Sequence, residues 1–273
     1  MTVLIIDTSY FNFYRFFATS QWYKRAYPDE VFEGEYNWAD NTIFWEKFKK
    51  MFVNTLNTII KKCGANKVLF ARDCPRKDIW RVPLFTNYKG DREENYKKNN
   101  FQGGPVFKKC YSDIIDPLID NSQFYQIKIN HLEADDIIAL TCKNIHLNYP
   151  DENIIIISSD HDLLQLINPN ITLMDAKMKS YNNKSAGSKE LDIFLKCITG
   201  DASDCIPKVF DKVGPKTAIK LYNNKKLLDK KFQENPESRE RYILNNTLVS
   251  FDNIPIELQE TYLKEFNKLA KLH

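Results

Sequence analysis

Short apolar runs alternate with stretches of helical spacing over the first part of the chain. The runs are rich in β-branched residues, as is typical of buried strands, and they cover residues 2–7, 68–71, 124–129, 153–158 and 171–174. Between them, apolar residues recur every three or four positions, which predicts helices that pack one face on a sheet. Strands that alternate with helices require right-handed crossovers, so we expect an α/β fold with a mostly parallel central sheet and helices on both faces.

The helical stretches indicate how the chain is divided into domains. They cover the first half of 10–38 and then residues 41–62, 106–120, 133–146 and 162–167. Gly64 is a candidate stop for the second of these helices, because glycine is the usual residue after a helix end. From Glu190 onward only helices are predicted. We therefore expect an α/β domain over residues 1–189 and a helical C-terminal subdomain, packed against it, over residues 190–273.

Residues 74–105 form a polar, basic and poorly periodic segment between two predicted elements. A segment of this length inside a compact domain is usually a functional loop, so we expect a flexible lid or arch. Lys89 and Arg92 would share one face if this stretch is helical. Basic side chains interleaved with Tyr88 suit phosphates and a stacked base. The alternative is an exposed, mobile charged loop without a function of this kind.

Acidic residues stand where predicted strands end or predicted helices begin. They are Asp7, Asp73, Glu133, Asp135, Asp136, Asp160, Asp162, Asp201 and Asp204. The carboxyl ends of neighbouring parallel strands meet at one crevice, and carboxylates gathered there repel one another unless cations neutralise them. Hard oxygen ligands without a Cys/His cluster favour Mg²⁺ or Mn²⁺ over Zn²⁺. The pattern therefore predicts a divalent-metal site with many carboxylate ligands.

Helix capping is the alternative explanation for some of these acids. In Glu133-Ala-Asp-Asp, three acids within four residues exceed what a helix N-terminus needs. Glu133 and Asp136 would share one face of the helix, and Asp135 would point elsewhere. Capping likewise explains only one of Asp160 and Asp162, which can face the same side of an extended strand end. His161 between them is expected to be an exposed neighbour and not a ligand.

A second pattern follows in residues 200–222. Gly200-Asp-Ala-Ser-Asp204 and the later Val213-Gly-Pro-Lys-Thr217 predict a helix, a tight turn and a second helix, centred on residues 201–222. Exposed N–H groups at the start of the second helix can bind a phosphate, and Lys216 would add charge. Many helix hairpins bind nothing, so this pattern alone leaves both interpretations open.

Composition narrows the class of protein. The hydrophobic share of 43% is enough for a sizeable core, and no apolar run approaches the roughly 20 residues that span a bilayer. The first residues lack the basic and long apolar regions of a signal peptide. The 6 cysteines are scattered without a CxxC pair, which indicates a reducing, intracellular compartment. Net charge is only +3, but bases concentrate in 72–109 and 208–231, beside the acids, as suits a polyanion bridged by metals.

The order of these motifs resembles the flap endonuclease / 5′-3′ exonuclease family, most of all its phage RNase H-type 5′-nucleases. The resemblance runs from Leu4 to about Tyr222. It rests on Ile6-Asp7-Thr8-Ser9, on Asp73 followed by Trp80-Arg81 and Tyr88-Lys89-Gly90-Asp91-Arg92, on Glu133-Ala134-Asp135-Asp136, on Ser158-Ser159-Asp160-His161-Asp162 and on Gly200-Asp201-Ala202-Ser203-Asp204. Three features depart from the family pattern: Cys205 replaces an asparagine, residues 207–214 lack the earlier glycines of the hairpin, and Arg72 precedes the second acid.

The resemblance implies a PIN-like or 5′-nuclease-like fold with a helix-hairpin-helix-like element, and a structure-specific, metal-dependent nuclease. Such an enzyme cleaves DNA or RNA near the 5′ end in duplex, flap or RNA–DNA hybrid substrates. It leaves a 5′-phosphate and a 3′-hydroxyl, and it acts in the removal of replication primers. Single-strand binding protein or a clamp are possible replication partners by the same resemblance. We expect a monomer inside the cell, or in the host cytoplasm if the source is a phage.

The resemblance also implies roles for the residues in these motifs. Two Mg²⁺ ions, for which Mn²⁺ would substitute, are expected: the first on Asp7, Asp73, Glu133 and Asp135, the second on Asp160, Asp162 and Asp201, with Asp204 acting through water. Asp136 would act through water or a basic neighbour. Lys89 and Arg92 would contact the scissile phosphate, and Tyr88 would stack on a terminal base. The remaining expected nucleic-acid contacts are Arg72, Arg81, Lys97, Lys98, Gly214, Lys216 and Thr217. Cellular members also bind a monovalent cation with the hairpin, a use that the missing glycines put in doubt.

Three other functions compete with this one. A binding or interaction module unrelated to nucleic acid would leave the order of the five motifs as a coincidence. A PIN-type ribonuclease also has a parallel sheet with clustered carboxylates, but the hairpin after Asp201 and the Tyr-Lys-x-x-Arg segment weigh against it. A non-catalytic, structure-specific DNA-binding protein would have lost carboxylates, and none is missing from the motifs.

Overall fold

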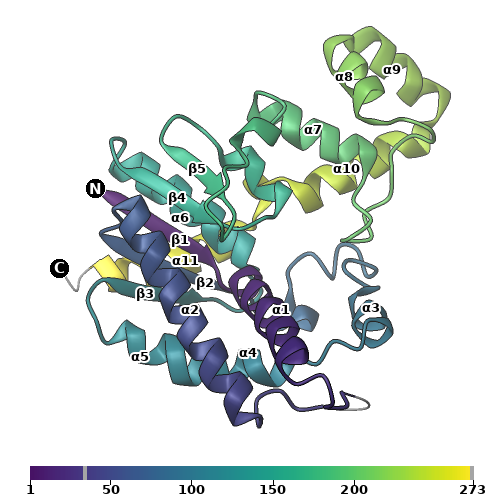
Figure 1. Ribbon diagram of the computed structural model, residues 1–273. Coiled ribbons are helices and arrows are strands. Elements are labelled where there is room, and N and C mark those ends of the chain that lie inside the picture. The colour runs from purple at the N-terminus through teal and green to yellow at the C-terminus, as the bar shows by residue number, and fades with distance from the viewer. Residues whose placement is uncertain (33–35, 271–273) are drawn as a thin grey trace.

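A five-stranded parallel sheet forms the centre of the molecule in the computed structural model, which describes residues 1–32 and 36–270. The strands lie in the order β3-β2-β1-β4-β5 (Figure 1). Their bounds are β1 Thr2–Asp7, β2 Lys67–Arg72, β3 Phe124–Lys128, β4 Asn153–Ile157 and β5 Ile171–Met174. All five strands were predicted, with ends that differ by at most one residue. The predicted parallel sheet is confirmed.

The register of the sheet brings the acidic motifs to one edge. Asp7, the last residue of β1, pairs with Ala71 of β2, and Ile6 pairs with Ile157, the last residue of β4. Asp73 and Ser158 therefore follow their strands at the same level as Asp7. The carboxyl ends of β1, β2 and β4 thus open into one crevice, as the strand-end pattern predicted.

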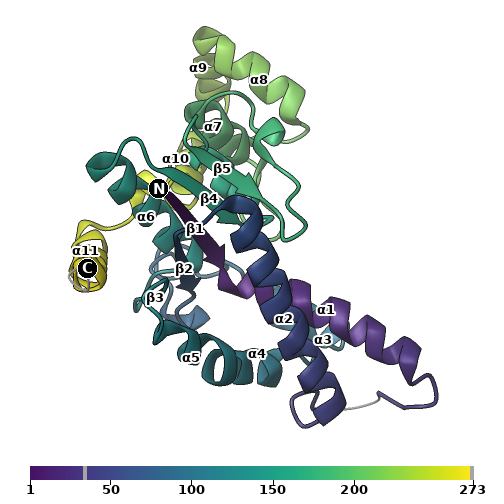
Figure 2. The same ribbon diagram turned by 60° about the vertical axis from the view of Figure 1, so that its left-hand side comes forward.

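Helices cover both faces of the sheet (Figure 2). One face carries α1 Thr8–Ala26, α2 Thr42–Cys63, α4 Gly104–Cys110, a π-helical turn Tyr111–Ile115 and α5 Asp116–Ile119. The other face carries α6 Ala134–Asn148 and α11 Ile256–Ala270. The two cores draw on alternate residues of β1, with Leu4 and Ile6 on the first face and Val3 and Ile5 on the second, because successive strand side chains point to opposite faces. Gly64 ends α2 at φ 60°, the predicted left-handed stop.

The segment predicted as a lid has two parts with different burial. Its first part contains a 3₁₀ turn, Arg76–Asp78, and packs Cys74, Ile79 and Tyr88 against the C-terminal helices. Its second part contains α3 Arg92–Lys98, and residues 93–100 are all exposed. The expected lid or arch over residues 74–105 therefore does not describe the first part, where apolar side chains join a core.

The C-terminal helices are α7 Lys189–Thr199, α8 Pro215–Asn223, α9 Lys225–Glu234, α10 Pro236–Val249 and α11. Helices α7 to α10 share a core, and α8 and α9 stand away from the sheet (Figure 1). In contrast, α11 returns to the sheet and buries Tyr262 beside α6. The predicted subdomain 190–273 thus splits, and its residues 271–273 lie outside the described part. Short 3₁₀ turns cover His161–Leu166, Asn182–Lys184 and Phe251–Asn253.

The predicted helix hairpin needs a correction. Its two helices are α7 and α8, and the link between them is the long, turn-rich stretch 200–214 and not a tight turn. Only α8 lies inside the predicted 201–222. In the part of the chain that the structure describes, no helix is long and apolar enough to cross a membrane.

Candidate metal centre

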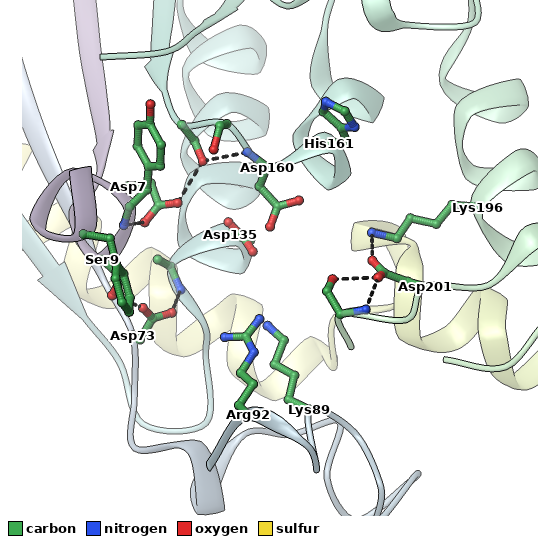
Figure 3. Close-up of a pocket in the computed structure, with 16 residues that line it drawn as sticks. Asp7, Ser9, Asp73, Lys89, Arg92, Asp135, Asp160, His161, Lys196 and Asp201 are labelled. Carbon is green, nitrogen blue, oxygen red and sulfur yellow. Dashed lines mark hydrogen bonds and ion pairs between the residues drawn. The ribbon is translucent and has the colours of Figure 1, made fainter. Parts of the chain in front are cut away.

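A cavity of about 500 Å³ opens at the carboxyl edge of the sheet. Carboxylates line one side of it and cationic side chains reach it from the lid and from α7 (Figure 3). The charged lining residues are Asp7, Asp73, Lys89, Arg92, Asp135, Asp160, Lys196 and Asp201. Most of the acids singled out in the sequence therefore meet in one place, although they come from strand ends far apart in the chain.

Local hydrogen bonds hold the carboxylates in the cavity. Asp7 caps α1, accepting the Tyr10 amide at 3.0 Å, and it also accepts the Ser158 hydroxyl at 2.8 Å. Asp73 accepts the amide of Ala134 at 2.8 Å, at the start of α6. Asp160 caps the next turn by accepting the Asp162 amide at 2.8 Å. Capping and cavity lining are thus combined in the same side chains, so the capping alternative does not compete with a site.

Two carboxylic acids in the cavity have pKa values above their usual range. Burial, together with the charges of Asp73 and Asp160, raises the pKa of Asp7 to about 7. Burial and the charges of Asp160 and Asp7 likewise raise the pKa of Asp135 well above its usual range. Among the described residues, none of Asp7, Asp73, Asp135 and Asp160 forms an ion pair. Charged, crowded oxygen ligands of this kind fit a hard divalent cation.

A second group of acids lies beside the first. Asp162, Asp201 and Asp204 each offer an oxygen, and these oxygens lie within 4.8 Å of one another, close enough for one metal ion. The Lys196 ammonium pairs with both Asp162 and Asp201, at 2.6 Å from the latter. Burial alone would raise the pKa of Asp201, but the Lys196 charge and hydrogen bonds from Lys196 and Ser203 lower it to about 2.

Glycine is required where this second group begins. Gly200 has φ 68° and ψ −179°, a conformation that is essentially restricted to glycine. A Cβ at this position would lie 2.5 Å from the carbonyl oxygen of Ile206. The close approach allows Asp201 and Ile206 to exchange backbone hydrogen bonds of 2.9 and 2.8 Å, which fixes the turn that carries Asp201 and Asp204.

Two predicted metal ligands, Glu133 and Asp136, are turned away from the cavity. Glu133 accepts hydrogen bonds from Lys89, from Arg81 at 2.9 Å and from the Tyr88 hydroxyl at 3.0 Å. Asp136 is fully buried and receives both terminal nitrogens of Arg81, at 2.7 and 2.9 Å, and the Trp80 indole. Their oxygens are occupied by the chain's own donors, so the metal prediction is not supported for this pair. The basic neighbour expected for Asp136 is Arg81.

The lid residues correct two further predictions. Arg81 is 3% exposed and also donates to the Leu248 carbonyl at 2.7 Å, so it joins the lid to α10 and is not positioned to bind nucleic acid. Tyr88 is 5% exposed, with its ring in a core and its hydroxyl on Glu133 and Asp204, so it cannot stack on a base in this conformation. The basic and aromatic residues of this segment suggested nucleic-acid binding, but Arg81 and Tyr88 are instead buried by apolar contacts and hydrogen bonds within the chain.

Lys89 and Arg92 do reach the cavity, although not as one face of a helix. Lys89 has φ 55° and precedes α3, while Arg92 is its first residue. Lys89 pairs with Glu133, and its amide donates to the Asp204 carbonyl at 3.1 Å. The Arg92 side chain is 40% exposed and pairs with Asp204 at 3.1 Å. Two cations therefore face the carboxylates from the lid side.

The remaining predicted contacts lie outside the cavity. The Arg72 guanidinium stacks 3.8 Å from the Tyr111 ring centre and donates to Gln126 at 2.8 Å. Lys97 and Lys98 are exposed on α3, where Lys98 pairs with Glu94 at 2.9 Å. The other three are exposed at the start of α8: Gly214, Lys216 and Thr217. His161 is exposed, as expected.

The structure adds residues that the sequence did not single out. The Ser9 hydroxyl donates to Asp73 and the Ser158 hydroxyl donates to Asp7. Both serines lie in motifs in which only the acidic residues were predicted to belong to the site. Phe13 lines the cavity as an aromatic side chain, the position expected for Tyr88. Lys196 had no local signal, because it precedes Asp201 on an ordinary amphipathic helix.

Comparison with known proteins agrees with this architecture. The family model described as 5′-3′ exonuclease, N-terminal resolvase-like domain, matches residues 2–191. The 5′-3′ exonuclease of Mycoplasmopsis pulmonis is 34% identical over 191 residues, which cover 67% of this chain and 59% of that protein. The 5′-3′ exonuclease of Buchnera aphidicola from Schizaphis graminum is 29% identical, covering 60% of this chain and 55% of that protein. The chain thus spans less than two thirds of the length of these curated relatives.

Solved structures share the fold over almost the whole chain. The T5 D15 protein co-crystallised with metal ions aligns with a TM-score of 0.70 and 20% identity, covering 99% of this chain and 100% of that one. The T5 D15 flap endonuclease in complex with DNA and metal ions aligns with a TM-score of 0.69 and 19% identity, over 99% and 100%. Together with the family match over residues 2–191, this places the chain in the 5′-3′ exonuclease family.

Proposed function

We propose that the chain is a structure-specific, divalent-metal-dependent 5′-nuclease. It would hydrolyse phosphodiester bonds near the 5′ end of DNA or RNA in duplex, flap or RNA–DNA hybrid substrates, leaving a 5′-phosphate and a 3′-hydroxyl. The observation that carries the proposal is the cavity in which Asp7, Asp73, Asp135 and Asp160 meet with no ion-pair partner among the described residues, facing Lys89 and Arg92. Family membership and the metal and DNA complexes of the T5 proteins support it.

The donor set suits Mg²⁺, with Mn²⁺ as a substitute. All candidate ligands are carboxylates, and neither cysteine nor a second histidine joins them in the cavity. Asp7, Asp73, Asp135 and Asp160 would hold one ion, and Asp162, Asp201 and Asp204 a second. Bound ions of this kind lower the pKa of water and neutralise charge that develops on the leaving oxygen.

The cationic lid residues would bind the phosphate to be cleaved. Glu133 holds the Lys89 ammonium at the cavity wall, so this charge is in position before substrate arrives. Arg92 is more exposed, and it would exchange Asp204 for a phosphate oxygen. Phe13, at the cavity wall, offers the aromatic face on which a terminal base could rest.

Duplex binding is proposed for the exposed basic residues outside the cavity. The start of α8 would contact a duplex phosphate mainly through the exposed Lys216 ammonium, because Pro215 has no N–H and the Thr217 amide already donates to the Gly214 carbonyl. Lys97 and Lys98 of α3 would follow a strand that enters under the lid. DNA polymerase I of Lactococcus lactis subsp. cremoris is 27% identical over 97% of this chain and 30% of that protein, which supports a role in replication primer removal inside the cell. We propose a monomer that works with other replication proteins.

The test is cleavage of a 5′-end-labelled flap and of a matched RNA–DNA hybrid. Purified protein would be incubated with Mg²⁺, with Mn²⁺, with EDTA, and as the Asp160→Asn variant. We expect metal-dependent release of 5′-phosphorylated products that both EDTA and the substitution abolish, while binding of the substrate persists in the variant. Cleavage that continues in EDTA, or binding without cleavage in any divalent ion, would overturn the proposal. The second outcome would favour a DNA-binding protein.

A further inference from the structure

The Lys196 ammonium lies where the second divalent ion is expected. It contacts Asp162 and lies 2.6 Å from Asp201, two of the three acids whose oxygens could hold one metal ion. Its side chain is only 18% exposed. Figure 3 shows Lys196 and Asp201 together on one side of the cavity, across from Asp7 and Asp73. An ammonium group therefore already occupies the position of the ion and offsets part of the charge of these acids.

The backbone of Lys196 is fixed, so only its side chain can leave this position. Its neighbours on α7, Phe194, Cys197 and Ile198, are buried in two cores. The side chain borders both the main cavity and an adjoining one of about 300 Å³ that Asp162 and Pro215 also line. The flexible four-carbon stem of a lysine can therefore move its charge from the acids into either space while the helix stays in place.

We propose that Lys196 is a built-in competitor for the second divalent ion. The inference rests on the proposed function and describes how the two divalent ions enter the metal centre. In the metal-free protein the ammonium pairs with Asp162 and Asp201 and offsets part of their charge, and a divalent ion enters only by displacing it. The first ion meets no such competitor, because Asp7, Asp73, Asp135 and Asp160 have no ion-pair partner among the described residues. The two ions therefore bind in order and with different affinity.

Substrate changes this competition. A displaced Lys196 would reach the main cavity on the side where Lys89 and Arg92 already face the carboxylates. Lys89 and Arg92 already pair with Glu133 and Asp204, whereas a bound phosphate would give the displaced ammonium a new anion to pair with. Substrate thus favours the displaced lysine and with it the second ion, so the cation pair is completed only when a phosphate is present.

The test is a titration of the protein with Mn²⁺ in the absence of nucleic acid, followed by calorimetry and by electron paramagnetic resonance of free Mn²⁺. Wild type, Lys196→Met and Lys196→Arg are compared. The matched control is Lys189→Met, which removes the same charge from the same helix at a residue that pairs with Asp252 outside the main cavity. Circular dichroism checks that each variant folds; Lys196→Gln replaces Lys196→Met, and Lys189→Gln replaces Lys189→Met, if the methionine variant does not.

We expect wild type to bind one ion tightly and a second at least about tenfold more weakly, a difference of ~1.4 kcal/mol. Lys196→Met should tighten the second ion at least about tenfold and leave the first unchanged, while Lys196→Arg and Lys189→Met resemble wild type. Equal affinity of both ions in wild type, an unchanged second ion in Lys196→Met, or the same tightening in Lys189→Met would each overturn the inference. Binding as expected without cleavage of any substrate would overturn only the proposed activity. No Mn²⁺ binding at all would overturn both.

Discussion

Two groups of carboxylates that share helix α6 have opposite environments. The open cluster, Asp7, Asp73, Asp135 and Asp160, lines the cavity without a cation of its own. The paired network consists of Glu133 and Asp136 with Arg81 and Lys89, and it is closed by ion pairs of the chain itself. Asp135 stands between two members of the network in sequence, yet it belongs to the cluster. Membership of a motif therefore does not decide which carboxylate is free to hold a metal.

Helix geometry and the lid explain the difference. Successive residues of a helix point about 100° apart, so Glu133 and Asp136 share a side that Asp135 does not. The lid passes along that side, where Arg81 reaches both acids and Lys89 reaches Glu133. A buried carboxylate with a partner is stabilised in its charged form, and one without a partner is not. Indeed, although burial raises it, the charges of Lys89 and Arg81 lower the pKa of Glu133 to about 2, whereas the pKa of Asp7 rises to about 7.

The largest expected effect is on cleavage, in the Asp135→Asn variant. Removal of one charge from the open cluster should lower the cleavage rate at least about 10³-fold, as expected when a preorganised electrostatic group is lost. The same change should raise the melting temperature in EDTA, because it relieves the repulsion by Asp160 and Asp7. Rates are measured on the labelled flap and melting by circular dichroism.

Glu133→Gln is the matched variant from the same helix turn. It removes the partner of two buried cations, so it should lower the melting temperature in EDTA. If Asp135→Asn is the destabilised variant and Glu133→Gln the stabilised one, the distinction between cluster and network is wrong.

Loss of Arg81 should give the next largest effect, on folding stability. Arg81→Met leaves Lys89 as the ion-pair partner of Glu133 and removes the one ion pair that the fully buried Asp136 forms among the described residues. Removing one partner of a buried pair typically costs about 3–5 kcal/mol, so the free energy of unfolding in urea should fall by that amount. Arg92→Met is the control: the Arg92 side chain is 40% exposed, and the buried Asp204 keeps Lys89 and the Tyr88 hydroxyl as partners, so the loss should be smaller, about 1 kcal/mol. An equal loss in both variants would contradict the role of burial.

A smaller effect is expected in the pH dependence of the metal-free protein. The raised pKa of Asp7, about 7, means that the folded chain keeps a proton between pH 5 and pH 7 that the unfolded chain has lost. Stability should therefore fall as pH rises, by about 2 kcal/mol from pH 5 to pH 8 in EDTA. The groups facing Asp7 are the Asp73 and Asp160 charges, the Tyr10 amide and the Ser158 hydroxyl. Asp7→Asn should reduce the fall in urea unfolding without abolishing it, because the pKa of Asp135 is raised as well, and saturating Mn²⁺ should remove the fall. A wild-type profile that rises over this range would contradict the assignment.

The sheet and the position of the site could be predicted from the sequence because both follow from local patterns. Short β-branched runs fixed the strands, and parallel pairing made the acids after β1, β2 and β4 converge. The predictions that were wrong concerned residues whose positions depend on contacts between distant segments of the chain. Arg81 and Tyr88 were predicted to contact nucleic acid from the lid, but contacts with α10 and the core beneath the lid bury them. Lys196 reaches Asp162 across 34 residues, and no pattern within α7 indicates that reach.

The smallest expected effect concerns the turn 201–206, which supplies Asp201 to the Lys196 pair and Asp204 to the lid cations. Cys205 adopts φ 60° in this turn, a left-handed conformation that disfavours most side chains but that asparagine tolerates. Cys205→Asn should therefore raise the free energy of unfolding by up to about 1 kcal/mol and leave cleavage unchanged. Cys205→Ala, which keeps the Cβ but removes the thiol, should give no such gain. If alanine stabilises as much as asparagine, the thiol and not the backbone strains the turn. If only asparagine stabilises the protein, then asparagine is the usual family residue at this position because it tolerates the left-handed backbone next to Asp204. Its side chain is then not needed to balance the charge of either group of carboxylates.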